Sequence, residues 1–222
     1  QALDSIDRQS DACRPAWTDA SWTDFKSDQA FNGLIRCGEW TVDMQTLAPS
    51  GLPDAERFPW PLPSTLVMPT MLHLPKAGSL YLEFAEHGRD ESVQTLQSTM
   101  LRLLASLPPG KVRFTVIDPV GLGQSFAGFM HLADHEDAHI LEKVWTEPRH
   151  IEQQLTDLTE HMENVIQTYL RNEYETITDY NEQAGNIAEK YHFLVIADFP
   201  ASFSETAVKR LQSIAMSGPR CG

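Results

Sequence analysis

Residues 83–92, EFAEHGRDES, stand where a phosphate-binding loop is expected, between an apolar stretch and a long helical pattern. A working loop of this kind reads G-x-x-x-x-G-K-[ST]. Its glycines let backbone amides surround the phosphates, its lysine reaches the outer phosphates, and its hydroxyl holds Mg²⁺. With Ser92 as the hydroxyl, Glu91 stands at the lysine and Asp90 at the second glycine. Only Gly88, inside the loop, and Ser92 suit phosphate binding.

The charge at position 91 decides between a working and an altered loop. A unit charge about 5 Å from a phosphate charge contributes roughly 3 kcal/mol at an effective dielectric constant near 20. Replacing lysine by Glu91 turns attraction into repulsion and costs on the order of 6 kcal/mol, about four powers of ten in affinity. Arg89 or Mg²⁺ would offset part of this cost. The simpler interpretation is that GRDES begins a helix whose acidic residues complement its positive end.

A second group of candidate residues is HEDAH, residues 135–139, which matches the H-E-x-x-H zinc motif. His135 and His139 would hold the metal, and Glu136 would be the general base. The motif falls in a polar segment between two strands, and a third ligand is not defined by the sequence. A solvated loop is therefore favoured over a metal site. The nearby GLGQSFAG, residues 121–128, lacks the G-x-G-x-x-G order and predicts a turn.

The elements that must position these residues alternate between strand and helix from residue 79 onward. Apolar and β-branched runs predict strands, and apolar residues at helical spacing predict helices. The expected strands are 79–84, 112–119 and 191–200, and the expected helices are 89–107, 151–170 and 204–218. This order implies right-handed crossovers, so we predict an α/β fold with a mostly parallel sheet flanked by helices.

The first part of the chain has a different pattern. Residues 1–30 are polar and aperiodic, with Trp17 and Trp22 as isolated anchors. Period-two alternation over 33–47 predicts a β-hairpin that turns at residues 37–39. Pro69 makes residues 65–75 an expected edge strand. We predict a linker and β-hairpin extension over 1–63 and an α/β domain over 64–222, truncated at its C-terminal end.

Composition restricts the partners. The net charge is −14, with 17 basic and 31 acidic residues, which does not favour DNA or an anionic membrane as a partner of this segment. Three widely spaced cysteines indicate neither a disulfide framework nor a thiolate metal site. No apolar run reaches the length of a membrane span. These features predict a cytoplasmic protein.

Residues 64–222 resemble the RecA-type P-loop motor domain of the FtsK/SpoIIIE DNA translocases. The resemblance rests on a strand that ends Ile117-Asp118-Pro119 and on ITDYNEQAG, residues 177–185, before an apolar strand. It implies a RecA-like P-loop NTPase fold and a Walker B strand that ends Asp-Glu, with one residue for Mg²⁺ and one to polarise water. Here Asp198 stands for the magnesium aspartate and Phe199 replaces the glutamate, or, with the alignment shifted by one residue, Ala197 and Asp198 take the two positions. Walker A and Walker B have therefore both lost key groups.

Three functions follow as hypotheses. The first is a non-catalytic, degenerate P-loop domain that acts as scaffold or regulator of an active motor domain, with other P-loop domains of the chain or ring as partners. The second is retained binding of ATP and Mg²⁺, without efficient hydrolysis, at an altered site of Gly88, Arg89, Glu91, Ser92 and Asp198. The third is a zinc hydrolase at HEDAH. The resemblance allows DNA as a partner of the whole protein, but the charge does not favour DNA as a partner of this acidic segment.

Overall fold

A computed structural model describes residues 17–26, 33–47, 50, 64–134, 139–171, 173–184 and 188–222. The chain divides into two compact units: Gln1–Lys26 with Ile35–Met71, and Ser27–Leu34 with Leu72–Gly222. We call these the ribbon unit and the sheet unit. Within the described ranges, no helix combines the length and the apolar character needed to cross a bilayer.

The ribbon unit is built on a two-stranded sheet of β1 (Leu34–Asp43) and β2 (Thr65–His73). The unit also contains two short helices, η1 (Ala20–Asp24) and α2 (Met44–Leu47). The predicted hairpin turn at residues 37–39 is wrong, because β1 runs through these residues and pairs with β2 instead. Gly38 keeps a negative or extended φ, whereas the tight hairpin turns need positive φ. In a two-stranded sheet both strands are edges, so Pro69 is tolerated within β2.

The sequence suggested that Trp17 and Trp22 are isolated anchors, but in the structure their rings contact one another. The rings of Trp17 and Trp22 lie 4.7 Å apart, and those of Trp22 and Phe25 lie 5.3 Å apart. The three rings form a small aromatic cluster at η1. Sequence reasoning missed it because the predicted linker offered no periodic apolar face.

The sheet unit contains a three-stranded parallel sheet in the order β4-β3-β5. Its strands are β3 (Val112–Ile117), β4 (Leu141–Trp145) and β5 (Tyr191–Ile196). β3 and β5 pair in unbroken register from Val112↔Tyr191 to Ile117↔Ile196. Both are nearly continuous in apolar residues, which is typical of a strand with covered faces. The predicted α/β fold with a parallel sheet is confirmed.

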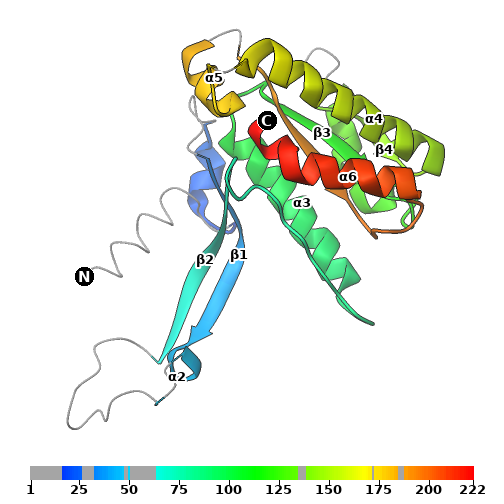
Figure 1. The fold of residues 1–222 in the computed structure, drawn as a ribbon. Helices are drawn as coiled ribbons and strands as arrows, with labels where there is room; N and C mark the ends of the chain where they lie inside the picture. The colour runs from blue at the N-terminus through cyan, green and yellow to red at the C-terminus, as the bar shows by residue number, and fades with distance from the viewer. Residues whose placement is uncertain are drawn as a thin grey trace. The chain divides into compact units, whose positions relative to one another are not determined.

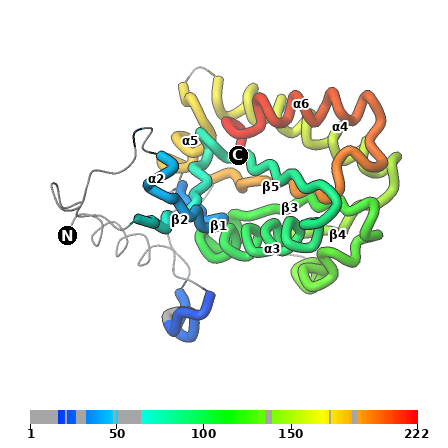
Figure 2. Tube along the Cα trace, turned by 90° about the horizontal axis from the view of Figure 1, so that it is seen from below, coloured from blue at the N-terminus to red at the C-terminus, as the bar shows by residue number. Residues whose placement is uncertain are grey.

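Helices cover both faces of this sheet (Figure 2). α3 (Arg89–Ser106) lies on one face, and α4 (Pro148–Val165) and α6 (Glu205–Ser217) lie on the other. α4 continues as the short π-helix η4 (Ile166–Leu170), and α5 (Ile177–Ala184) follows before β5 (Figure 1). The 3₁₀ segments η2 (Gln124–Asp134) and η6 (Gly218–Arg220) complete the unit.

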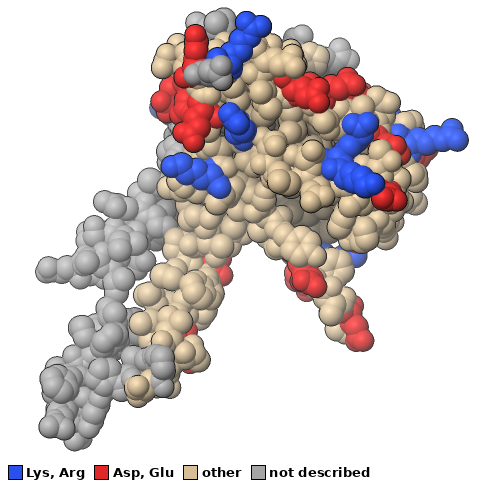
Figure 3. All heavy atoms as spheres, in the orientation of Figure 1, with Lys and Arg blue, Asp and Glu red and all other residues tan. Residues whose placement is uncertain are grey.

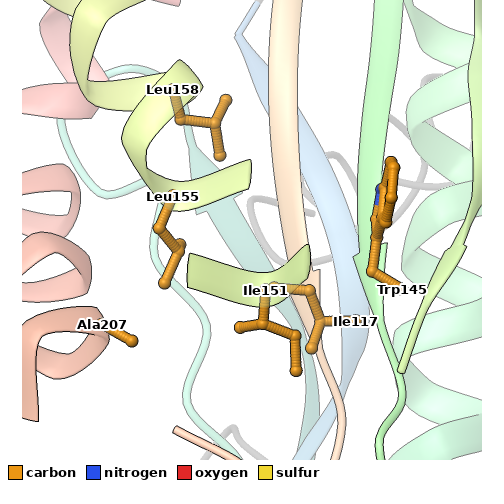
Figure 4. Packing of buried hydrophobic residues seen from close by; sticks show 6 residues of the cluster. All are labelled: Ile117, Trp145, Ile151, Leu155, Leu158 and Ala207. Atoms are coloured by element: carbon orange, nitrogen blue, oxygen red, sulfur yellow. The ribbon is translucent and has the colours of Figure 1, made fainter. Parts of the chain in front are cut away.

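A cluster of apolar side chains joins α4 and α6 to the sheet (Figure 4). Its buried members come from β3, β4, α4 and α6: Ile117, Trp145, Ile151, Leu155, Leu158 and Ala207. Ile151 and Leu155 have no exposed surface. The apolar residues of the expected helix 151–170 are buried along all of α4, at Ile151, Leu155, Leu158, Met162 and Val165. Ile166, the first residue of η4, is 36% exposed.

α6 begins and ends as the sequence predicted. The Ser204 hydroxyl accepts a hydrogen bond from the backbone N–H of Ala207, 3.1 Å away. It therefore caps the first turn of the helix. α6 gives way at Gly218 to the short 3₁₀ turn η6.

Two strand predictions in the sheet unit differ from the structure. Residues 79–84 were expected to form the strand before the loop, but they are not paired in the sheet, and Tyr81 is 76% exposed. Their apolar side chains alternate as in a β-strand, but in the described part of the chain no neighbouring strand forms backbone hydrogen bonds with them. β4 was not predicted, because it has only five residues and carries Glu142 and Lys143 at its centre.

The β3–β5 pair also holds a histidine that stays neutral. His192 Nε2 lies 2.8 Å from the Thr115 hydroxyl, and the His192 and His161 ring centroids are 6.3 Å apart. Burial lowers the pKa of His192 from its usual value of 6.5 to about 3, and the charges of Arg113 and His161 add to this effect.

This lowered pKa predicts a loss of stability in mild acid. Between pH 6.5 and pH 3 the unfolded chain binds the proton and the folded chain does not, so stability falls as the pH falls through this range. We expect the His192 contribution to drop by about 1–2 kcal/mol between pH 7.5 and pH 5. Urea unfolding at both pH values, compared with His192→Gln, measures it. Equal losses in the two proteins would contradict the prediction.

Candidate functional site

The candidate site lies where two parallel strands end. Asp118 follows β3 directly, and Asp198 follows β5 after one residue. Because β3 and β5 are parallel and in register, their carboxyl ends meet at one edge of the sheet, the usual place for ligands in such folds. Arg89, the first residue of α3, lies at the same edge.

Arg89 and Asp198 form a two-pronged ion pair. Arg89 Nε donates to Asp198 Oδ1 at 2.8 Å, and Nη2 donates to Oδ2 at 2.6 Å. The Arg89 side chain is 33% exposed and the Asp198 side chain is 10% exposed. The hydrogen bond to Asp198 is the largest of the effects that raise the pKa of Arg89 above its ordinary value. The guanidinium therefore stays charged, and both carboxylate oxygens of Asp198 are engaged.

Asp118 is the buried anion of the site. Its side chain has no exposed surface. Oδ1 accepts from the backbone N–H of Gly121 at 3.0 Å, and Oδ2 accepts from that of Ser125 at 3.2 Å. Arg89 Nη2 lies 3.8 Å from Oδ1. The carboxylate thus organises the loop after β3 and faces the Arg89 cation.

Gly121 is required by this close packing. A Cβ atom at position 121 would lie 2.5 Å from Asp118 Oδ2 and 2.5 Å from the Ser125 hydroxyl. The loop is also tied to α3, because the Gln97 side-chain amide donates to the backbone carbonyl of Ser125. The predicted turn at residues 121–128 is confirmed for 121–123, whereas residues 124–128 form the first part of the 3₁₀ segment η2.

The structure separates the predicted nucleotide-binding residues into two groups. Arg89 and Asp198 form the first group and contact one another, whereas Gly88, Glu91 and Ser92 lie at the start of α3. Gly88 precedes α3 with φ 102°, and Ser92 is part of the first helical turn, with its N–H bonded to the Gly88 carbonyl. Glu91 is exposed on that turn.

Sequence reasoning missed Asp118, Ser125 and Gln97 as site residues. The signal for Asp118 was present, since it follows a buried strand in the same way as Asp198. Ser125 and Gln97 carried none, because nothing in their spacing links the backbone of Ser125 to a side chain of the expected helix 89–107.

The zinc hypothesis gains no support from the described residues. His135 lies outside them, and His139 is described at φ 47°. Over the described ranges, no three His, Cys, Asp or Glu side chains are grouped so that they could hold a metal ion.

The residues at the sheet edge do not fit Mg-ATP. Arg89 engages both oxygens of Asp198, the carboxylate that would hold the metal. Glu91 stands where a lysine would reach the phosphates. A single glycine, Gly88, provides no open backbone cradle, and a Cβ atom there would lie 3.3 Å from Phe84 Cβ.

A parallel sheet between helices, with acidic residues at the carboxyl ends of its strands, defines an open α/β domain, the class to which RecA-like P-loop domains belong. The FtsK/SpoIIIE family model matches residues 91–218, more than half of the chain, so the chain belongs to the FtsK/SpoIIIE family. The match covers Asp118, Ser125 and Asp198 and begins just after Arg89. No curated protein and no solved structure matches the chain.

Proposed function

We propose that residues 64–222 are a non-catalytic, degenerate P-loop domain that acts in the cytoplasm as scaffold or regulator of an active FtsK/SpoIIIE-type motor domain. The observation that carries the proposal is the ion pair between Arg89 and Asp198. It places an internal cation on the carboxylate that a motor domain needs for Mg²⁺.

The energy of this pair supports the proposal. Charge-assisted, bidentate arginine–carboxylate contacts are among the stronger hydrogen bonds of proteins. Mg²⁺ would have to displace Arg89 from Asp198, which is 10% exposed, and leave the guanidinium without its partner. The repulsion between Glu91 and a bound phosphate adds to that cost. Both effects act in the same direction, against ordinary nucleotide binding.

The expected partners are other P-loop domains of the same chain or ring rather than DNA. On the face of the sheet unit that Figure 3 displays, Lys and Arg side chains lie in small separate groups among Asp and Glu. Neutralising a DNA backbone requires an extended basic surface. A net charge of −14 does not favour such a basic surface.

Titration calorimetry of the protein with Mg-ATP and Mg-ADP at moderate salt tests the proposal. We expect no binding heat up to millimolar nucleotide, because the metal carboxylate is occupied and the lysine is replaced. ATP without Mg²⁺ gives the dilution control. Micromolar binding would contradict the proposal and would support the alternative of a retained nucleotide site lined by Gly88, Arg89, Ser92 and Asp198.

A further inference from the structure

We propose that Arg89 is a tethered cation that occupies, in place of a divalent metal ion, the position between the carboxylates of Asp118 and Asp198. The position takes Mg²⁺ or Mn²⁺ once the Arg89 side chain is removed. The inference rests on the proposed function, because it explains why the edge of the sheet does not fit Mg-ATP.

One nitrogen of Arg89 marks the cation position. Nη2 lies 2.6 Å from Asp198 Oδ2, 3.4 Å from the Ser125 hydroxyl oxygen and 3.8 Å from Asp118 Oδ1. The three oxygens belong to two carboxylates and a hydroxyl, and they come from the ends of two different strands and the loop after β3. Oxygen donors of this kind are the ligands that Mg²⁺ and Mn²⁺ prefer.

Charge explains why the position needs a cation. Asp118 is fully buried, and among the described residues each of its side-chain oxygens accepts one backbone hydrogen bond, which leaves further acceptor capacity. The negative charges of two neighbouring carboxylates repel one another, and a positive charge between them offsets that repulsion. Arg89 supplies that charge on its own chain, so the site is neutralised without a dissociable ion. The wild-type site is therefore independent of divalent cations and of chelators.

The experiment compares four proteins with the metal alone, without nucleotide. They are the wild type, Arg89→Ala, the double variant Arg89→Ala/Asp198→Asn, and Lys209→Ala. The last removes a lysine from an exposed pair with Glu205 and is the matched control for loss of a positive charge. Thermal melts in MgCl₂ are compared with melts in KCl of equal ionic strength. Electron paramagnetic resonance counts bound Mn²⁺.

We expect Arg89→Ala to bind one Mn²⁺ that the wild type does not bind, with a Kd on the order of 0.1–1 mM. Its melting temperature should rise by about 2–4 °C at 10 mM Mg²⁺ relative to KCl. The wild type, the double variant and Lys209→Ala should show neither effect. If Arg89→Ala does not fold alone, Arg89→Gln replaces it, and folding rescued by Mg²⁺ counts as metal binding.

The inference is overturned if the wild type binds Mn²⁺ as tightly as Arg89→Ala, or if neither Arg89 variant responds to metal. It is also overturned if the double variant binds as the single variant does. None of these results depends on nucleotide. Failure here therefore differs from failure of the proposed function, which would appear as Mg-ATP binding to the wild type.

Discussion

Replacing Asp118 by alanine is expected to destabilise the protein by about 3–5 kcal/mol, because it breaks a buried charged network. The substitution leaves the N–H groups of Gly121 and Ser125 without their acceptor and removes a carboxylate that faces Arg89. Denaturant unfolding followed by circular dichroism measures the change. Asp118→Asn keeps one acceptor oxygen and should lose about half as much.

Asp90 is a matched control for this prediction. Its carboxylate also lies 3.8 Å from the Arg89 guanidinium, but its side chain is 86% exposed. Because water screens an exposed pair, Asp90→Ala should cost less than about 1 kcal/mol. Equal losses for Asp90→Ala and Asp118→Ala would show that burial and the backbone hydrogen bonds of Asp118 contribute nothing.

Leu155→Ala should cost about 3–4 kcal/mol, because it leaves a cavity between α4, α6 and the sheet. Leu155 has no exposed surface, and it belongs to the buried cluster that includes Ile117 of β3 and Ala207 of α6 (Figure 4). A rigid backbone on both sides cannot collapse into the space. The midpoint of denaturant unfolding should fall without a change in its slope.

Leu101→Ala on α3 is the control for Leu155→Ala. Leu101 is 47% exposed, so its removal should cost less than about 1 kcal/mol. If both substitutions cost the same, α4 does not pack on the sheet as described.

The fold was predictable from the sequence where burial is continuous. β3 and β5 are six-residue strands that are apolar except at Arg113, Thr115 and His192, and the main helices carry apolar residues at helical spacing. β4 was not predictable, because Glu142 and Lys143 interrupt a five-residue strand whose only evidence is its pairing with β3. Residues 79–84 were predicted to form a strand and do not, because alternation of apolar residues does not ensure that a neighbouring strand is present to pair with.

The candidate site was predictable in part. Arg89 and Asp198 were both candidates, but no spacing rule pairs residues 109 positions apart. Their contact depends on where α3 docks against β5, which is a tertiary property. Asp118 was seen only in the Ile-Asp-Pro resemblance. Its role follows once β3 and β5 are known to be adjacent and parallel, because their ends then share one edge of the sheet.

The sequence separation of Arg89 and Asp198 also has a kinetic consequence. Their pair closes a segment of 109 residues, and it forms only after α3 and the β3–β5 sheet have docked. A contact between residues so far apart in sequence stabilises the chain only after the entropy of closing the intervening loop has been lost. Interactions absent from the transition state slow unfolding without accelerating folding. We therefore expect the pair to slow the unfolding of the domain more than it accelerates folding.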